Sequence, residues 1–193
     1  MVVPAVLTVP ANRPRRLSRQ ESCSRASTCG SCPANVYGAG SKPWVDDLGA
    51  ELKKGTPSLI GGGDYDAGLV HVDHVVDVLL RAAGKAGARG QIYNAADEEG
   101  VTWRQYMTDL AALHGAPSPR SVPRPLAQVL AAAGESTWRL LNLASRPPLT
   151  REALNLVGSR HRIDMSKTRR ELGFMPLKTY RDGLQEIRIY LSA

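Results

Sequence analysis

Two short apolar runs flank a helix-length segment near the middle of the chain, and this order limits the fold more than any other feature. The runs at 69–72 and 91–95 are typical of buried strands. Between them, apolar residues recur on one face at the spacing of an amphipathic helix, namely Val72, Val75, Val76, Leu79, Leu80 and Ala83. A strand, a helix and a second strand in this order predict a parallel pair, and hence an α/β fold.

The rest of the chain after residue 33 carries further short elements, most of them helical. A strand is expected at 57–60, where it ends in the glycines of 61–63, which we interpret as a loop or hairpin turn. Thr102, with Gln105 three residues later, begins a helix that runs to Leu113. Further helices are predicted at 126–144, 150–157, 166–172 and, after the cap Thr179, at 180–191.

The first 32 residues differ in composition from the rest and are predicted to be a disordered or non-native leader before a domain at 33–193. This leader holds five arginines against one acid, so it supplies +4 of the net charge of +7. No stacking aromatic residues are interleaved with the basic ones, which argues against nucleic-acid binding. An alternative for this Arg- and Ser-rich, acid-poor segment is an organellar transit peptide, and another is translation in a shifted reading frame.

All three cysteines lie in that leader, and the spacing of Cys29 and Cys32 matches a CxxC motif. No strand and helix context or fourth ligand accompanies them, so coincidence is the preferred interpretation over a redox or metal site. A cysteine-free domain favours a reducing, cytoplasmic location. No apolar run approaches the roughly 20 residues that a bilayer span needs.

Four segments together resemble the extended short-chain dehydrogenases/reductases, the NAD-dependent epimerase/dehydratase family. Residues 33–41 (PANVYGAGS) are similar to the family's RPxNVYGPG segment, and 70–77 (VHVDHVVD) to its VHVDDVV junction. Residues 92–97 (IYNAAD) resemble its YNVGD strand, and 163–176 (IDMSKTRRELGFMP) its FDxSKARxELGxxP segment. The resemblance implies a partial Rossmann-type α/β fold, mainly the helix-rich carboxyl-terminal half that contacts substrate, with a few parallel strands.

The resemblance implies NAD or NADP as cofactor, yet two parts of that machinery are missing from the 193 residues. A Gly-rich turn at a helix amino terminus would receive the pyrophosphate, whereas the only glycine cluster is followed by Asp64 and Asp66, which would repel a phosphate. The family's proton donor is a Tyr with a Lys four residues later, and none of the six tyrosines has one. We therefore expect no catalytic residue in this chain and doubt cofactor binding by it alone.

What the resemblance leaves are secondary contacts. Pro33, Asn35, Val36 and Tyr37 are the candidate cofactor-side residues, and Asn35 and His71 the candidate substrate-side residues. Asn35 offers a donor and an acceptor to a ligand, although a purely structural role in a turn has equal weight. A metal site of His71, Asp73 and His74 is disfavoured, because Asp73 is explained by the helix dipole and His71 by burial in a strand.

Ala67 stands where sugar-nucleotide members carry a phosphate-binding Arg, which tilts the expected small-molecule substrate toward steroid- or flavonoid-like compounds without excluding nucleotide sugars. The leading hypothesis is a truncated oxidoreductase-family member that needs its other half from elsewhere. The alternative is a non-catalytic relic or interaction module. In either case an exposed surface meant for the missing sheet predicts self-association.

Overall fold

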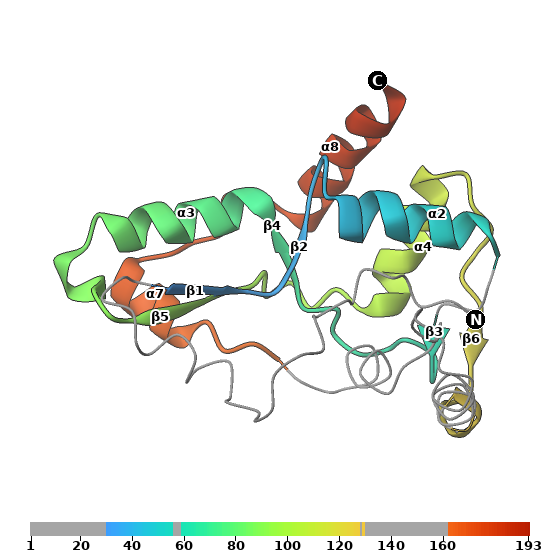
Figure 1. The fold of residues 1–193 in the computed structure, drawn as a ribbon, viewed down its shortest axis with the longest axis horizontal. Helices are drawn as coiled ribbons and strands as arrows, with labels where there is room; N and C mark the ends of the chain where they lie inside the picture. Colours follow the sequence, from blue (N-terminus) through green and yellow to red (C-terminus); the bar gives the residue numbers. More distant parts are fainter. Residues whose placement is uncertain (1–29, 56–58, 128, 130–161) are drawn as a thin grey trace, which may run out of the picture.

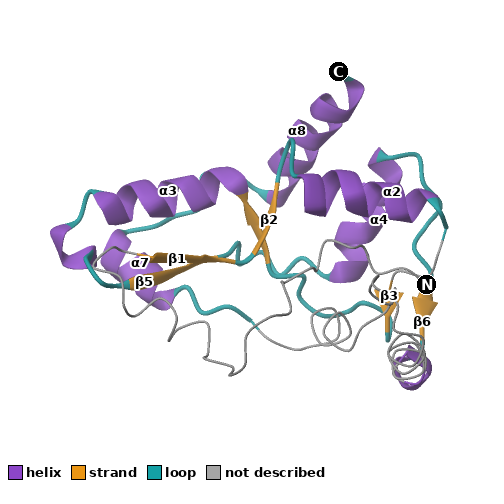
Figure 2. Cartoon of the chain, in the orientation of Figure 1, coloured by secondary structure: helices purple, strands orange, loops and turns teal. Residues whose placement is uncertain are grey.

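The computed structural model describes residues 30–55, 59–127, 129 and 162–193. Within them the architecture is α/β, with helices around short parallel strands (Figures 1 and 2). The leader up to residue 29, the predicted helix at 150–157 and all but three residues of the one predicted at 126–144 lie outside this description. Among the described helices, none has the length and apolar character to cross a membrane.

Strand pairing departs from the pattern expected from sequence order. Strand β1 (Gly30–Pro33) pairs in parallel with β5 (Ile92–Ala95), and β2 (Asn35–Tyr37) pairs in parallel with β4 (Leu69–His71). The strands before and after the central helix are therefore not partners of one another. The reason is that the extended segment 30–37 changes partner at Ala34, whose N–H donates to Ala95 while the N–H of the next residue donates to Gly68.

The first described strand begins inside the predicted leader. Strand β1 begins at Gly30, three residues before the predicted start at Pro33, in a stretch without any strand signal of its own. It contains Gly30 and Pro33, two residue types that are depleted in strands. The pairing with β5, in which Gly30 faces Ile92 and Pro33 faces Ala95, overrides that propensity.

The remaining strands and the turn after them lie at the other end of the molecule. Strand β3 (Leu59–Ile60) pairs in parallel with β6 (Ser121–Val122), so the glycines that follow β3 form a loop turn and not a hairpin. Between β2 and β3 the chain forms a π-helix, η2 (Lys42–Asp47), that continues into α2 (Leu48–Lys53). These elements surround the first of two hydrophobic clusters, which includes Leu59, Trp103, Tyr106, Leu110 and Ile187.

Besides the central helix, three predicted helices are confirmed. Helix α4 (Trp103–Leu113) begins where the Thr102 hydroxyl accepts the Gln105 N–H. Helix α7 (Ser166–Leu172) ends at Gly173, whose left-handed φ of 66° is easily adopted by glycine. Helix α8 (Tyr180–Ser192) has the reciprocal capping box of Thr179 and Asp182.

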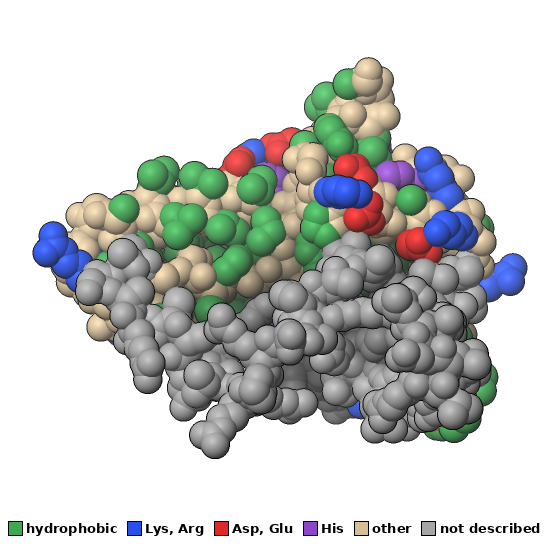
Figure 3. All heavy atoms as spheres, viewed as in Figure 1, with side chains coloured by type: hydrophobic (Ala, Val, Ile, Leu, Met, Phe, Trp, Pro, Cys, Tyr) green, Lys and Arg blue, Asp and Glu red, His purple; other side chains and the backbone are tan. Residues whose placement is uncertain are grey.

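The central helix, α3 (Val72–Ala83), packs on β1 and β5 by a face that the apolar pattern did not indicate. Its buried residues are His74, Val78 and Ala82, of which Val78 and Ala82 join the second hydrophobic cluster together with Tyr93 and Leu172. The stripe read from the sequence is mostly exposed: Val72 is 40% exposed, Val76 47%, Leu79 44% and Leu80 68%. Figure 3 shows apolar side chains gathered over α3. The 3_10 helix η3 (Ala86–Ala88) then leads to β5.

Candidate functional site

The segment that carries the candidate cofactor-side residues lines a cavity of about 370 Å³, which we call the Val36 pocket. Side chains alternate along a strand, so Val36 of β2 and Ala34 before it face the same side. Gly38, Trp44 and Val72 also belong to its mainly apolar lining. Gly38 has a φ of 141°, and a Cβ there would lie 3.0 Å from Val72 Cγ1. Glycine therefore allows the backbone at residue 38 to lie close to the Val72 side chain.

The other two residues of β2 point away from the Val36 pocket. Asn35 Nδ2 donates to the Ala67 carbonyl at 2.6 Å, which ties β2 to the turn before β4. Tyr37 is 1% exposed, and its ring lies edge-on to His71 and Tyr106. Burial raises the pKa of the Tyr37 phenol well above its ordinary value, with Asp97 and Glu99 adding to the shift. Pro33 is exposed at the end of β1, and Val36 is the one of these four that lines the Val36 pocket. Tyr37 instead lines a separate cavity of about 10 Å³, next to Asp97 and Tyr180.

A second cavity of about 480 Å³, the Asp97 pocket, lies beyond the carboxyl end of β5. It is lined by charged side chains from three parts of the chain, namely Asp66, Asp97, Glu98, Arg162, Asp164 and Arg169. Arg169 pairs with Glu98, and Arg162 Nε lies 3.8 Å from Asp66 Oδ2. Four acids against two arginines that are already paired make this cavity unfavourable for a phosphate.

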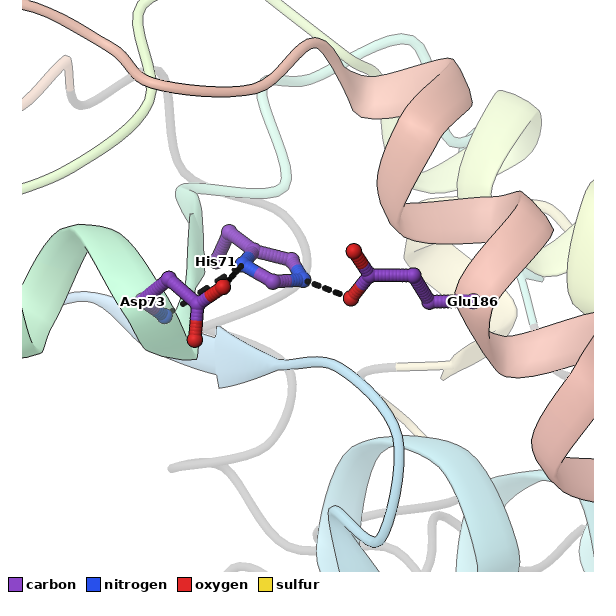
Figure 4. A group of neighbouring side chains, drawn as sticks. All are labelled: His71, Asp73 and Glu186. Carbon is purple, nitrogen blue, oxygen red and sulfur yellow. Dashed lines mark hydrogen bonds and ion pairs between the residues drawn. The ribbon is translucent and has the colours of Figure 1, made fainter.

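His71, the candidate substrate-side residue, is 1% exposed and lines neither cavity. Its Nδ1 accepts the Asp73 N–H at 3.3 Å, so its proton lies on Nε2. That atom is 3.3 Å from Glu186 Oε2 of α8 but makes no hydrogen bond with any described residue (Figure 4). Burial is the main cause that lowers the pKa of His71, which therefore stays neutral near pH 7.

Ligand atoms of His71, Asp73 and Glu186 lie within 4.8 Å of one another, a spacing that a metal ion would tolerate. The positive charge among them is already supplied by Lys178, whose Nζ lies 2.5 Å from both Asp73 Oδ2 and Glu186 Oε1. These hydrogen bonds lower the pKa of Asp73 and raise that of Lys178. The group is thus an ion network that joins the start of α3 to α8.

His74 is a buried residue with hydrogen bonds at both ring nitrogens, a role that the sequence interpretation missed. It is 1% exposed, and its Nε2 accepts the N–H groups of Leu177 and Lys178 at 3.0 and 3.1 Å. The hydrogen therefore lies on Nδ1, which faces Asp97 Oδ1 at 2.6 Å. One signal in the sequence could have indicated this role. His74 occupies the position of the second Asp in the VHVDDVV pattern, and a buried imidazole there needs hydrogen-bond partners for both ring nitrogens.

Comparison with curated proteins finds relatives that are all reductases or dehydrogenases where they are named by activity. A 4-hydroxy-2-methyl-3-oxo-4-farnesyl-3,4-dihydroquinoline-1-oxide ketoreductase of Stigmatella aurantiaca is 30% identical over 81% of this chain and 47% of its own length. A 2-alkyl-3-oxoalkanoate reductase of Stenotrophomonas maltophilia is 27% identical over 83% of this chain and 50% of the reductase. A sterol-4-alpha-carboxylate 3-dehydrogenase, decarboxylating, of Dictyostelium discoideum is 28% identical over 66% and 40%.

The chain thus spans about half the length of the curated relatives it matches. No family model matches the sequence. Solved structures agree on the fold: gox2253 superposes with a TM-score of 0.62 at 19% identity, over 84% of this chain and 48% of its own. The dTDP-glucose 4,6-dehydratase DesIV of Streptomyces venezuelae, solved with NAD, superposes with a TM-score of 0.56 at 22% identity. The superposition covers 84% of this chain and 42% of DesIV. The chain belongs to the extended short-chain dehydrogenase/reductase family, the NAD-dependent epimerase/dehydratase group.

Proposed function

We propose that this chain forms the substrate-side and nicotinamide-side wall of an NAD(P)-dependent oxidoreductase that acts on a ketone or alcohol carrying a large apolar group. The observation that carries the proposal is the Val36 pocket, an apolar cavity of about 370 Å³ built on the segment that resembles the family's nicotinamide-side strand. Pockets for organic ligands are mostly apolar and of this size or larger. The Gly-rich turn and the Tyr/Lys pair, absent from these 193 residues, come in this proposal from other polypeptide.

The charges around the second cavity support an apolar substrate over a nucleotide sugar. The acids of the Asp97 pocket outnumber its arginines, and Ala67, which stands at the position of a phosphate-binding Arg, is 1% exposed and bonded through its backbone. The names of the relatives point the same way, since farnesyl, alkyl and sterol groups are all large and apolar. Both arginines of the Asp97 pocket are already paired with acids, so a diphosphate there would meet more negative than positive charge.

Binding of a ketone to the whole chain tests this proposal directly. A 2-alkyl-3-oxoalkanoate and progesterone are titrated separately while tryptophan fluorescence is followed, because Trp44 lines the Val36 pocket. We expect saturable quenching that Trp44→Phe abolishes, and no response to UDP-glucose. Val36→Asp should weaken the binding at least tenfold, whereas Leu177→Asp, at a residue 60% exposed and outside the pocket, should leave it unchanged. Tight UDP-glucose binding without ketone binding would overturn the proposal.

A further inference from the structure

Ser41 has the one side chain able to accept a hydrogen bond among the described residues that line the Val36 pocket. The other lining residues are glycine, alanine, valine and proline, together with Trp44, whose indole can only donate. In a mainly apolar cavity, a few fixed polar groups set the orientation of the ligand. What Ser41 offers to a ligand therefore decides which polar group the ligand can place beside it.

The hydroxyl of Ser41 is already used as a donor. Its Oγ lies 2.9 Å from the carbonyl oxygen of Val36, which can only accept, so the hydroxyl hydrogen lies between these two oxygens. A serine hydroxyl has one hydrogen and two lone pairs. Only the lone pairs of Oγ remain for a ligand, and Ser41 is therefore an acceptor in this pocket.

The backbone of Ser41 is held as well. Its N–H donates to the Gly38 carbonyl at 3.1 Å, and its C=O accepts the N–H groups of Val45 and Asp46 at 2.9 and 3.3 Å. The bond from Asp46, five residues along the chain, is of the kind that defines the π-helix η2. Turns of this kind are frequent at functional sites. Ser41 thus cannot turn its hydrogen toward a ligand without losing its bond to Val36.

The pocket wall next to Ser41 is anchored in the hydrophobic core. The Tyr106 hydroxyl donates to the Trp44 carbonyl at 2.6 Å, and the ring centroids of Trp44 and Trp103 lie 5.8 Å apart. Tyr106 and Trp103 both belong to α4 and to the first hydrophobic cluster. A wall held in this way loses little freedom when a ligand binds, which favours selection by the groups that it presents.

We propose that Ser41 is a specificity-determining residue, which makes the Val36 pocket select an apolar alcohol over the corresponding ketone. The hydroxyl of an alcohol donates its hydrogen to Ser41 Oγ, whereas a ketone oxygen in the same place brings two acceptors together without a hydrogen between them. One net hydrogen bond between neutral groups changes affinity by about fivefold. The inference rests on the proposed function and deepens it, since it names the alcohol as the form that the pocket holds more tightly.

The test repeats the tryptophan fluorescence titration of the whole chain with testosterone and androstenedione, which differ only by a hydroxyl or a ketone at one carbon. We expect testosterone to bind about fivefold more tightly. The methyl ether of testosterone keeps the oxygen but lacks the hydrogen, so it should bind no more tightly than androstenedione. These three titrations use only the wild-type chain and do not depend on the folding of any variant.

Variants at residue 41 then assign the preference to the serine hydroxyl. Ser41→Ala should abolish the preference for testosterone. Ser41→Thr keeps a hydroxyl on a backbone that is already extended, with φ of −71° and ψ of 94°, and should retain the preference. Ser121→Ala is the matched control, because the Ser121 hydroxyl accepts the Gly62 N–H at 2.9 Å outside the pocket, and this variant should behave like the wild type.

Several results would overturn the role of Ser41 and leave the proposed function intact. They are equal affinities of the two steroids for the wild type, tighter binding of the ketone, a methyl ether that binds like testosterone, and an unchanged preference in Ser41→Ala. If neither steroid binds, the proposed function fails and the role of Ser41 fails with it. The two failures are therefore distinguished by whether the steroids bind to the wild-type chain at all.

Discussion

His74 Nδ1 lies 2.6 Å from Asp97 Oδ1, and this pair joins the first turn of α3 to the segment after β5. Asp97 accepts a second hydrogen bond from the backbone N–H of His71 at 2.9 Å. The other ring nitrogen of His74 accepts two backbone N–H groups from the approach to α8. One buried imidazole thus connects three segments that lie up to 104 residues apart.

Replacing His74 by alanine is expected to destabilise the protein by about 3 kcal/mol. The change leaves the N–H groups of Leu177 and Lys178 without their acceptor and removes one of the two hydrogen bonds to the Asp97 carboxylate. Urea unfolding followed by circular dichroism measures this change. Arg104→Gln removes an ion pair whose side chains are 53% and 74% exposed, and it should cost less than about 1 kcal/mol. Equal effects of the two variants would show that the His74 contacts carry no special stability.

Acid is expected to weaken the fold through His71. Its folded-state pKa lies below the ordinary value of about 6.5, so the unfolded chain binds the proton more tightly. The stability it contributes is complete above about pH 6.5 and is lost as the pH falls toward its folded-state pKa. The charged and titratable groups around it are Asp73, His74, Lys178 and Glu186.

The measurement is the free energy of unfolding in urea at about pH 7.5 and about pH 5.5 for wild type and His71→Gln. The variant should lose less stability between these two pH values. Burial also lowers the pKa of His114, so some acid sensitivity remains in His71→Gln and should fall further in a double variant with His114→Gln. A pH dependence identical in wild type and His71→Gln contradicts the prediction.

Gly183 is a close-packing position in α8. A Cβ there would lie 2.8 Å from Tyr37 Cε2 and 3.1 Å from His71 Cδ2. Gly183→Ala should therefore lower the free energy of unfolding by about 1–3 kcal/mol through overpacking, even though alanine is the better helix former. Gly87→Ala, where no atom lies within 4 Å, is the control, and thermal unfolding compares the two. A higher free energy of unfolding for Gly183→Ala than for the wild type would contradict close packing of α8 against Tyr37 and His71.

The Lys178 bridge is expected to hold α8 against α3. Lys178→Met removes the ammonium that lies 2.5 Å from both Asp73 and Glu186, and it leaves these carboxylates close together. Since all three side chains are partly exposed, the loss should be about 1 kcal/mol and should shrink at high salt. Urea unfolding at low and high salt tests both points. A loss that does not depend on salt would contradict an electrostatic bridge.

Local sequence signals were sufficient for elements whose ends are marked by their own residues. The Thr102 and Thr179 caps and the stop at Gly173 predicted α4, α8 and α7 correctly, because capping depends on groups three or four residues apart. The four segments that resemble the family likewise identified the family and the α/β class. These features need no knowledge of distant contacts.

Tertiary structure alone decided the rest. Strand β1 exists because β5 pairs with it, and the apolar stripe of α3 faces outward because the helix buries His74, Val78 and Ala82 instead. Neighbouring side chains of β2 point in opposite directions, so that Val36 lines a pocket while Asn35 binds the Ala67 carbonyl. Which side chain has which role depends on the pairing of β2 with β4. The sequence by itself determined the helices with marked ends and the family. Pairing and burial depend on residues far apart in the chain, so only the folded arrangement selected the partners of each strand and the buried face of α3.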